Sequence, residues 1–193
     1  MKTIEERLDI LEEKMRSEKF RTSTGLGNEV GYYVFDYEPY EELKVRERID
    51  HLRDQNTIAK FGYQLQVYDL YELIIKLLED EDSLEDLIDL EEEEGTEYVF
   101  AAISDILRFD EQGSLIVNTI KEQTTNDSVI FLTGVGKCFP ILRSHKILNN
   151  LHQVMDHCPV VLFFPGRYTG NSLNIFGPVK DDNYYRAFPL VVR

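Results

Sequence analysis

Two unbroken apolar runs restrict the fold of this chain more than any other feature. Residues 128–133 read SVIFLT, and residues 159–166 read PVVLFFPG. Because successive side chains of a strand point to opposite faces of a sheet, a strand that is apolar at every position needs cover on both faces. A parallel sheet between two helical layers provides this cover. The runs therefore predict an α/β protein of three layers with a mostly parallel central sheet.

Shorter patterns supply the remaining strands of a sheet of about five. The aromatic stretch YYVFDY at 32–37 predicts a buried strand that ends before Pro39, and YQLQVYDL at 63–70 alternates apolar and polar residues as a strand does. The segments SLNIF and YRAFPLVV in the tail predict edge strands, because Pro189 has no amide hydrogen for a second neighbour.

Apolar residues at helical spacing occupy the segments between these strands. Over 1–20 they predict an N-terminal amphipathic helix, with steps of four, three and four between Ile4, Leu8, Leu11 and Met15. Further helices are expected from Pro39 to about Lys60, after Asp69, and over 144–155. Asp69 and Ser144 are the predicted N-caps of the last two, because short polar side chains satisfy free amides at a helix start.

Residues 79–124 keep helical spacing and contain no strand pattern. Gly95 and Gly113 divide this stretch into three parts. We interpret it as an acidic helical insertion within a single α/β domain of residues 1–193, since this length suits one well-buried domain and is short for two.

Negative charge is concentrated in the first half of the chain. The formal net charge is −15, from 36 acidic and 21 basic residues. Residues 95–193 hold 9 of each, which leaves 27 acidic and 12 basic residues in 1–94. Residues 79–94, EDEDSLEDLIDLEEEE, contain eleven acidic residues and no basic one. Such a face repels nucleic acid, so we do not expect direct DNA binding. A solvated helix face and a contact surface for a basic protein both stay open.

Composition also indicates where the protein works and what it lacks. No apolar run approaches the roughly 20 residues that span a bilayer, and the start MKTIEERLDILEEKM has no unbroken hydrophobic core of a secretory signal. We expect a cytoplasmic protein that does not enter membranes. Cys138 and Cys158 lack the Cys-x-x-Cys spacing, and the four histidines lack metal-ligand spacing. We therefore expect free thiols, no metal and no cofactor.

Residues 134–137, GVGK, resemble part of a phosphate-binding loop. The full motif GxxxxGK needs a glycine five positions before the second one, and a Ser or Thr after the lysine. This chain has Phe131 and Cys138 at these positions. We therefore interpret the segment as a tight turn in which glycine adopts a positive φ.

An anion site of another kind is the alternative. Its candidate cations, which lie near predicted strand ends, are Lys137, Arg143 and Arg167. Open α/β sheets bind ligands beyond the carboxyl ends of their strands. This placement suggests a phosphate- or nucleotide-sensing α/β protein without a standard Walker A motif.

Residues typical of catalysis are adjacent or scattered, and we expect no catalytic residue. Ser144 and His145 are neighbours, so on a helix their side chains point about 100° apart, and no Gly-x-Ser-x-Gly elbow is present. Asp36 at the end of the first strand is interpreted as a loop-capping residue.

Tyrosines beside arginines have the composition of protein interfaces. The candidates for partner binding are Arg167, Tyr168, Tyr184, Tyr185 and Arg186. Packing in the core is the alternative for the tyrosines.

Three blocks carry a more specific pattern. They are GLGNEVGYYVFDYEP (25–39), VIFLTGVGKCFPILRSHKILNNL (129–151), and PVVLFFPGRYTGNSLNIFG (159–177) followed by DDNYYRAF (181–188). These blocks resemble the BrxB family, small proteins encoded in BREX bacteriophage-defence operons. The resemblance runs over nearly the whole length and is loose only between about 79 and 124.

The resemblance implies a non-catalytic assembly or regulatory subunit that works with other BREX proteins. These include a DNA methyltransferase, a large ATPase and PglZ, an alkaline-phosphatase-like protein that is the implied partner. The family supplies no catalytic residue to carry over. The matching segments are candidates for folding or partner contact, namely 25–29, 133–137, 143–145, 149–150, 165–166 and 182–186.

Overall fold

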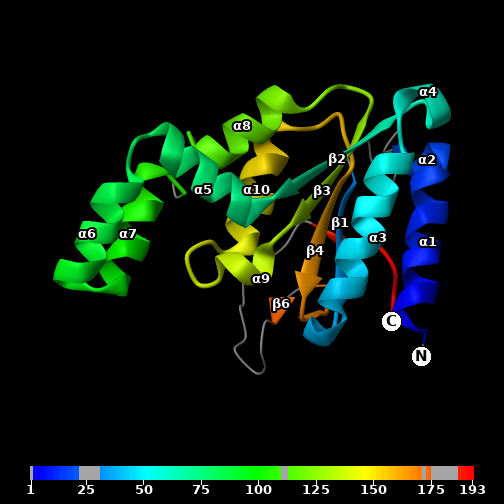
Figure 1. Cartoon of the computed structure of the whole chain (residues 1–193). Coiled ribbons are helices and arrows are strands. Elements are labelled where there is room, and N and C mark those ends of the chain that lie inside the picture. Colours follow the sequence, from blue (N-terminus) through cyan, green and yellow to red (C-terminus); the bar gives the residue numbers. More distant parts are fainter. Residues whose placement is uncertain (1, 22–30, 110–112, 171–172, 175–186) are drawn as a thin grey trace.

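A five-stranded sheet forms the centre of the molecule (Figure 1). The computed structural model describes residues 2–21, 31–109, 113–170, 173–174 and 187–193. The strand order is β2-β3-β4-β1-β7, and all neighbours pair in parallel. The strands are β1 (Tyr32–Tyr37), β2 (Gln64–Asp69), β3 (Ser128–Thr133), β4 (Val160–Pro165) and β7 (Phe188–Pro189). The predicted α/β fold with a parallel sheet of about five strands is confirmed.

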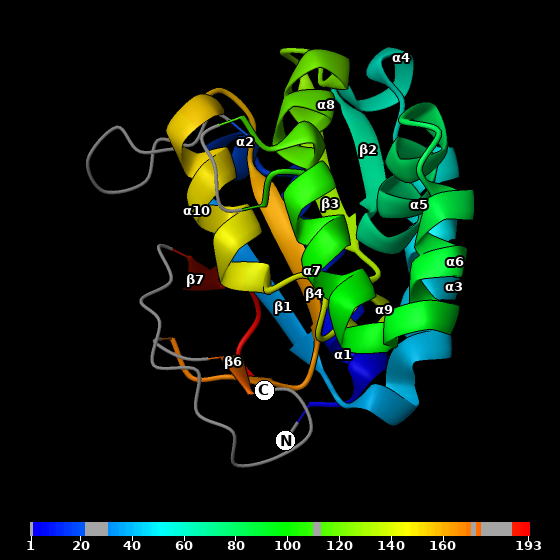
Figure 2. The same cartoon turned by 90° about the vertical axis from the view of Figure 1, so that its left-hand side faces the viewer.

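Helices cover both faces of this sheet, as the views in Figures 1 and 2 show. One face carries α1 (Ile4–Arg16) and α3 (Glu42–Gln55). The other carries α5 (Leu70–Asp80), α8 (Leu115–Gln123) and α10 (Ser144–Val154). Short turns of helix connect them, namely α2 (Glu18–Arg21), η1 (Pro39–Glu41), α4 (Ile58–Phe61) and α9 (Val135–Cys138). The three predicted layers are therefore present.

The two apolar runs explain why both layers are needed. In β3, Val129 and Phe131 belong to the core under α1 and α3, while Ile130 and Leu132 belong to the core under α5, α8 and α10. Strand β4 alternates in the same way, and all six of its residues are buried. Helical cover on both faces removes all of these side chains from water, which is the main favourable term in folding.

The predicted N-terminal amphipathic helix is present, but it ends at Arg16 and not at residue 20, because Ser17 has an extended backbone and separates α1 from α2. Thr3 and Glu6 form a capping box, in which Thr3 Oγ1 accepts from the Glu6 amide at 3.2 Å and the Glu6 carboxylate accepts from the Thr3 amide at 2.8 Å. The predicted stripe of Ile4, Leu8, Leu11 and Met15 is buried. Helix α1 is thus fixed by a local cap at its start and by packing along one face.

The prediction of one continuous helix from Pro39 to about Lys60 is wrong. This segment is divided into η1, α3 and α4, and Asn56 ends α3 with an extended backbone. The side-chain amide of Asn56 donates from Nδ2 to the Leu52 carbonyl at 2.6 Å, and the Tyr63 hydroxyl donates to Asn56 Oδ1 at 2.8 Å. A side chain that takes over the last carbonyl of a helix competes with continuation of that helix.

The cap predicted for α10 is also wrong, whereas that of α5 is confirmed. Arg143 occupies the N-cap position of α10 without a side-chain cap, and Ser144 is the first helical residue and is buried. Asp69 caps α5 as expected, since its Oδ1 accepts from the amides of Tyr71 and Glu72 at 3.0 and 3.2 Å.

The acidic stretch between β2 and β3 contains the predicted helices. They are α6 (Leu84–Glu94), α7 (Thr96–Ile106) and α8, with Gly95 between the first two at a φ of 94°. Helix α8 packs in the layer on the sheet, where Ile116, Val117 and Ile120 are buried. Helices α6 and α7 pack chiefly on each other and lie outside that layer (Figure 1).

Three short strands follow β4 in the part of the chain that the structure describes. Strands β5 (Arg167–Tyr168) and β6 (Leu173–Asn174) form a small antiparallel sheet, and β7 is an edge strand that contains Pro189, as predicted. Among the described residues, no helix combines the length and the apolar character needed to cross a membrane.

Phe163 provides a test of the two-sided core. Its ring is buried against Phe35 and Phe131, with ring centroids at 5.4 and 4.7 Å. We expect Phe163→Ala to lower the free energy of unfolding by about 3–5 kcal/mol, because it opens a cavity that the sheet and helices cannot fill. Phe188→Ala is the matched control, since the Phe188 side chain is exposed, and we expect it to change stability by less than about 1 kcal/mol. Urea unfolding measures both, and equal losses would contradict the assigned core.

Candidate functional site

The carboxyl ends of the strands bring together the loops that the sequence singled out. Tyr37 pairs with Pro165, and Asp69 pairs with Thr133, so β1 ends beside β4 and β2 ends beside β3. Segments 36–39, 133–140 and 165–168 therefore lie along one edge of the sheet. This is the edge at which open α/β sheets hold ligands.

Asp69 and Gly134 meet closely at this edge. Gly134 has a φ of 76°, and a Cβ at this residue would lie 2.3 Å from Asp69 Oδ1. Only glycine fits here, because both the positive φ and the near carboxylate exclude a side chain. The predicted tight turn at the GVGK segment is confirmed, and its close neighbour is a carboxylate.

Lys137 is held by two carboxylates. Its ammonium lies 2.7 Å from Asp69 Oδ2 and 3.3 Å from Glu72 Oε1. Partial burial by itself lowers the pKa of Lys137, but the hydrogen bonds to Asp69 and Glu72 outweigh it, so the net pKa is raised. The positive charge of Lys137, which a phosphate would need, is thus already paired with two carboxylates of the protein.

The other two candidate cations lie on separate elements. Arg143 immediately precedes α10 and Arg167 is the first residue of β5, and both are exposed. Within the described part of the chain, no shared hydrogen bond or ion pair joins either of them to Lys137. An anion site formed by all three stays a prediction.

The predicted Tyr/Arg contact residues differ in exposure. Tyr168 is buried, and its hydroxyl donates toward the carbonyls of Ala187 and Gly170 at 2.6 and 2.9 Å. Arg167 beside it is exposed. Tyr184, Tyr185 and Arg186 lie outside the described residues. Arg167 is therefore the one member of this pair whose side chain a partner could reach.

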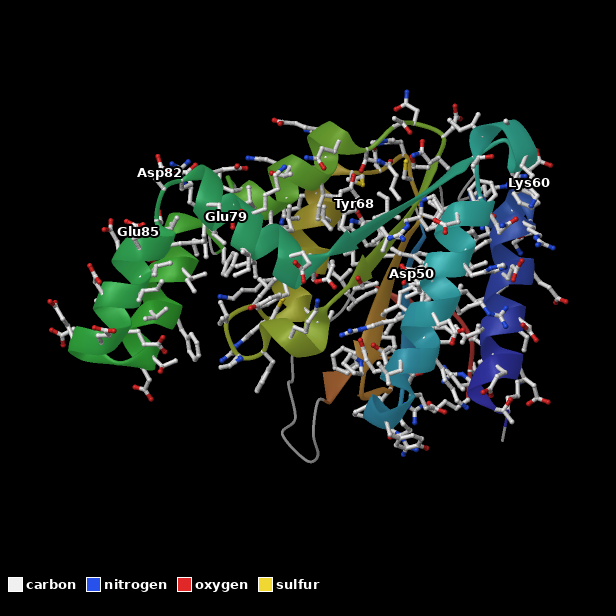
Figure 3. All side chains as sticks on the ribbon, in the orientation of Figure 1. Asp50, Lys60, Tyr68, Glu79, Asp82 and Glu85 are labelled. Atoms are coloured by element: carbon white, nitrogen blue, oxygen red, sulfur yellow. The ribbon has the colours of Figure 1, made fainter. Side chains whose placement is uncertain are left out.

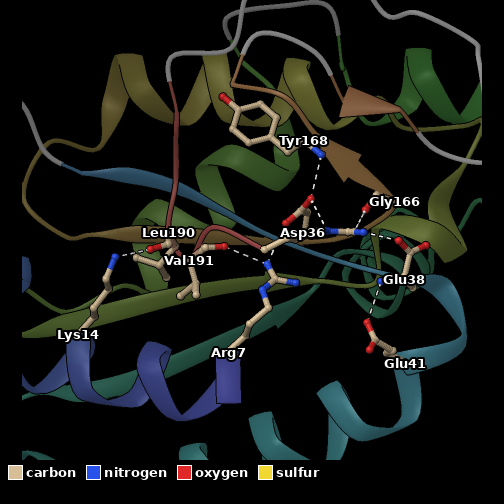
Figure 4. A network of polar contacts seen from close by, with 10 residues as sticks. Arg7, Lys14, Asp36, Glu38, Glu41, Gly166, Tyr168, Leu190 and Val191 are labelled. Carbon is tan, nitrogen blue, oxygen red and sulfur yellow. Dashed lines mark hydrogen bonds and ion pairs between the residues drawn. The ribbon is translucent and has the colours of Figure 1, made fainter. Parts of the chain in front are cut away.

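Asp36 is the centre of a buried polar cluster that sequence reasoning missed (Figure 4). Its Oδ1 lies 2.9 Å from Arg7 Nη2, and its Oδ2 lies 3.1 Å from Arg193 Nε. Oδ2 also accepts from the Tyr168 backbone amide at 3.1 Å. Asp36 does cap the loop after β4, but it also joins two arginines that are far away in the sequence. The available signal was an acidic residue inside the apolar run YYVFDY.

The two arginines extend this cluster to the chain ends. Burial lowers the pKa of Arg7, and the nearby Asp36 carboxylate opposes that effect. Arg7 also donates to the Val191 carbonyl at 3.0 Å. Arg193 donates to the Gly166 carbonyl at 2.6 Å and pairs with Glu38. The cluster therefore connects α1, β1, the loop after β4 and the last residues.

A cavity of about 220 Å³ lies between α3 and the strand ends. Its lining includes two basic residues of α3, Arg46 and Arg53. Arg46 Nε lies 2.8 Å from Glu42, and Arg53 Nη2 lies 3.1 Å from Asp50. Both cations therefore have a carboxylate partner on the same helix.

Both cysteines are free and buried. Burial raises the pKa of Cys138 to about 12 and also raises the pKa of Cys158. A thiol with a raised pKa is protonated near neutral pH and is a weak nucleophile. No group of three or more potential ligands for a metal ion occurs among the described residues.

Comparison with known proteins identifies the family. A family model described as "BREX protein BrxB" matches residues 66–190. A protein of that name from Bacillus cereus is 44% identical over 191 residues, which is 99% of each chain. The chain belongs to the BrxB family. A second BrxB protein, from Escherichia coli, is 31% identical over 189 residues, or 97% of this chain and 92% of the relative. No solved structure matches.

The regions that match the family include both the strand ends and helices α6 and α7. The match at 66–190 begins in β2 and ends beyond β7, so it includes α6 and α7 as well as the strand ends around Asp69 and Lys137. The alignments with the two relatives extend over nearly the whole chain and so include α1 and Asp36.

Asp36→Asn tests the role of the cluster. Removing one partner of a buried ion pair leaves the other charge without compensation, so we expect a loss of about 3 kcal/mol in the free energy of unfolding. Glu5→Gln is the control, because it breaks an exposed ion pair between Glu5 and Lys44 and is expected to leave the urea midpoint unchanged. If both variants shift the midpoint equally, the cluster does not have the assigned importance.

Proposed function

We propose that the protein is a non-catalytic assembly or regulatory subunit of BREX bacteriophage defence and that it binds PglZ. The main support for this proposal is that charged side chains at the strand ends already form ion pairs within the protein. The Asp36 carboxylate is held by Arg7 and Arg193, and the Lys137 ammonium is held by Asp69 and Glu72. Groups matched in this way stabilise the fold, and the same contacts compete with substrate for them.

The comparisons support the cellular context. Both relatives carry the name BREX protein BrxB, and each aligns with this chain over more than nine tenths of its own length. A chain with this similarity throughout is expected to work beside the same kinds of proteins. PglZ is the first partner to test, because the family resemblance points to it.

Two further observations favour binding over catalysis. The thiols of Cys138 and Cys158 are buried with raised pKa values, which removes them as ready nucleophiles near neutral pH. The chain also has a strongly acidic first half, with 27 acidic and 12 basic residues in 1–94. Such a charge distribution favours a basic protein partner and opposes binding to the phosphates of DNA.

Size-exclusion chromatography with light scattering tests the proposal. The purified protein is run alone, with PglZ, and with an unrelated phosphatase of similar size as the control. We expect a stable complex with PglZ at micromolar concentration, whose mass is the sum of whole subunits. Separate elution of the two proteins at that concentration would contradict PglZ binding.

A second candidate, phosphate or nucleotide sensing, rests on the cavity beside α3. Arg46 and Arg53 line it, at the edge of the sheet where such ligands bind. Under the leading proposal we expect phosphate, ATP and GTP to leave the melting temperature unchanged, because both arginines have carboxylate partners. Ligand-dependent stabilisation that is lost in Arg46→Ala or Arg53→Ala, and kept in Lys76→Ala, would favour the sensor instead.

A further inference from the structure

Helices α6 and α7 pack on each other as a helical hairpin, the α6–α7 hairpin, which the connection between β2 and β3 does not require. Strands β2 and β3 are parallel neighbours, and one crossover helix of about a dozen residues can connect such a pair. Helices α5 and α8 already lie on the sheet within this connection. The hairpin stands on the far side of that layer (Figure 1). Its length therefore needs another explanation.

The apolar face of the hairpin is incompletely covered. Each helix has one buried side chain, Leu87 in α6 and Ile103 in α7, compared with five in α5. Ile88 and Tyr98 are each 59% exposed. Further apolar side chains on the two helices pack against the core but are only partly buried, namely Leu84, Leu90, Val99, Ala102 and Ile106, and Phe100 is also only partly buried. Two helices with this pattern present apolar surface for which the described chain supplies no full cover.

Negative charge surrounds this surface. Eleven acidic residues in 79–94 are followed by Glu97 and Asp105, and no Lys or Arg occurs from 79 to 106. All thirteen are exposed, and none forms an ion pair with a described basic residue. Figure 3 shows Glu79, Asp82 and Glu85 on the solvent side of this region. Two exposed acidic residues of α1 differ in this respect, since Glu5 and Asp9 pair with Lys44 and Arg48 of α3.

Some of these charges work against the helix that carries them. The last turn of α6 contains four glutamates, 91–94, and no basic residue. The carboxyl end of a helix carries a partial negative charge, so anions there are unfavourable, and neighbouring like charges add repulsion. Sequences that break such local rules do so most often where function requires it.

The charge decides which occupant fits. A second copy would bring an equally acidic hairpin, which repels the first, and nucleic acid is repelled in the same way. A metal ion is not indicated, since the described residues hold no group of three potential ligands. A protein surface with an apolar patch and surrounding Lys and Arg residues complements both the exposed side chains and the charge.

We infer that the α6–α7 hairpin is the docking surface for a basic protein partner, with Ile88 and Tyr98 as its apolar contacts. This inference rests on the proposed function, because the partner is the BREX protein that the subunit binds. It goes further than the proposed function because it assigns partner contact to the hairpin and gives the strand ends a structural role only. Contact also brings opposite charges to the glutamates of the hairpin, which form no ion pair with a basic residue in the described part of the chain.

Paired variants of the full chain test the inference against PglZ by biolayer interferometry. The first pair compares Ile88→Ser/Tyr98→Ala with Ile58→Ser/Tyr40→Ala. Ile58 and Tyr40 are the same residue types outside the hairpin and are also exposed, by 51% and 84%. We expect the hairpin variant to raise Kd by about tenfold or more, as loss of central apolar contacts does, and the control to leave Kd unchanged.

The second pair separates charge from folding. Glu92→Gln/Glu93→Gln is compared with Glu13→Gln/Glu47→Gln, which removes two exposed charges from α1 and α3. We expect the hairpin variant to melt at the same or a higher temperature, because it relieves repulsion at the end of α6, and yet to bind PglZ several-fold more weakly. Raising NaCl from about 50 to about 300 mM should weaken wild-type binding more than binding of this variant.

The outcomes distinguish the two proposals. If the wild type binds PglZ and both hairpin variants bind it equally well, the hairpin is not the docking surface. The proposed function would still stand in that case. Equal loss in hairpin and control variants would also overturn the hairpin as the docking surface. Absence of wild-type binding to PglZ and to each other BREX protein tested singly would overturn the proposed function, and the inference would fall with it.

Discussion

Asp36 lies at the carboxyl end of β1, where its carboxylate meets the guanidinium groups of Arg7 and Arg193 and the backbone amide of Tyr168. These partners are 29, 157 and 132 residues away in the chain. One buried anion therefore fixes the first helix, the loop after β4 and the last residue against the same strand. A buried charge is tolerated only where such partners surround it, so each of these segments depends on the others.

Local sequence patterns were sufficient for most of the fold. The two apolar runs indicated β3 and β4 because burial on both faces leaves few alternatives, and Asp69 was identifiable as a cap because its bonds reach only two and three residues along the chain. At the break in the helix, the Asn56 side chain accepts a hydrogen bond from Tyr63, and at the start of α10 Ser144 is buried. Packing between elements decides such details, and no short pattern contains that information.

The candidate site was harder to predict for the same reason. Lys137 was correctly located at a strand end, but its partners Asp69 and Glu72 come from the previous strand and helix. Asp36 looked like a loop residue because Arg7 and Arg193 approach it only in the folded chain. Arg167 and Tyr168 are adjacent in sequence, yet one side chain is exposed and the other buried. Exposure and pairing are tertiary properties, which composition alone does not determine.

Charge is used in two ways within the molecule. Around the sheet, carboxylates and cations are paired, as in Asp36 with Arg7 and Lys137 with Asp69. Loss of one partner of a buried pair would leave the other charge without compensation. On α6 and α7 the acidic side chains have no described basic partner, and two helices of 11 residues each are too short to be stable alone in water. The hairpin is therefore held by Leu87 and Ile103 and by its connections to the core, through Leu78 before α6 and through Leu107 and Phe109 after α7. A segment anchored at both ends but weakly covered between them can be contacted without disturbing the sheet, which suits a surface whose stabilising partner lies on another protein.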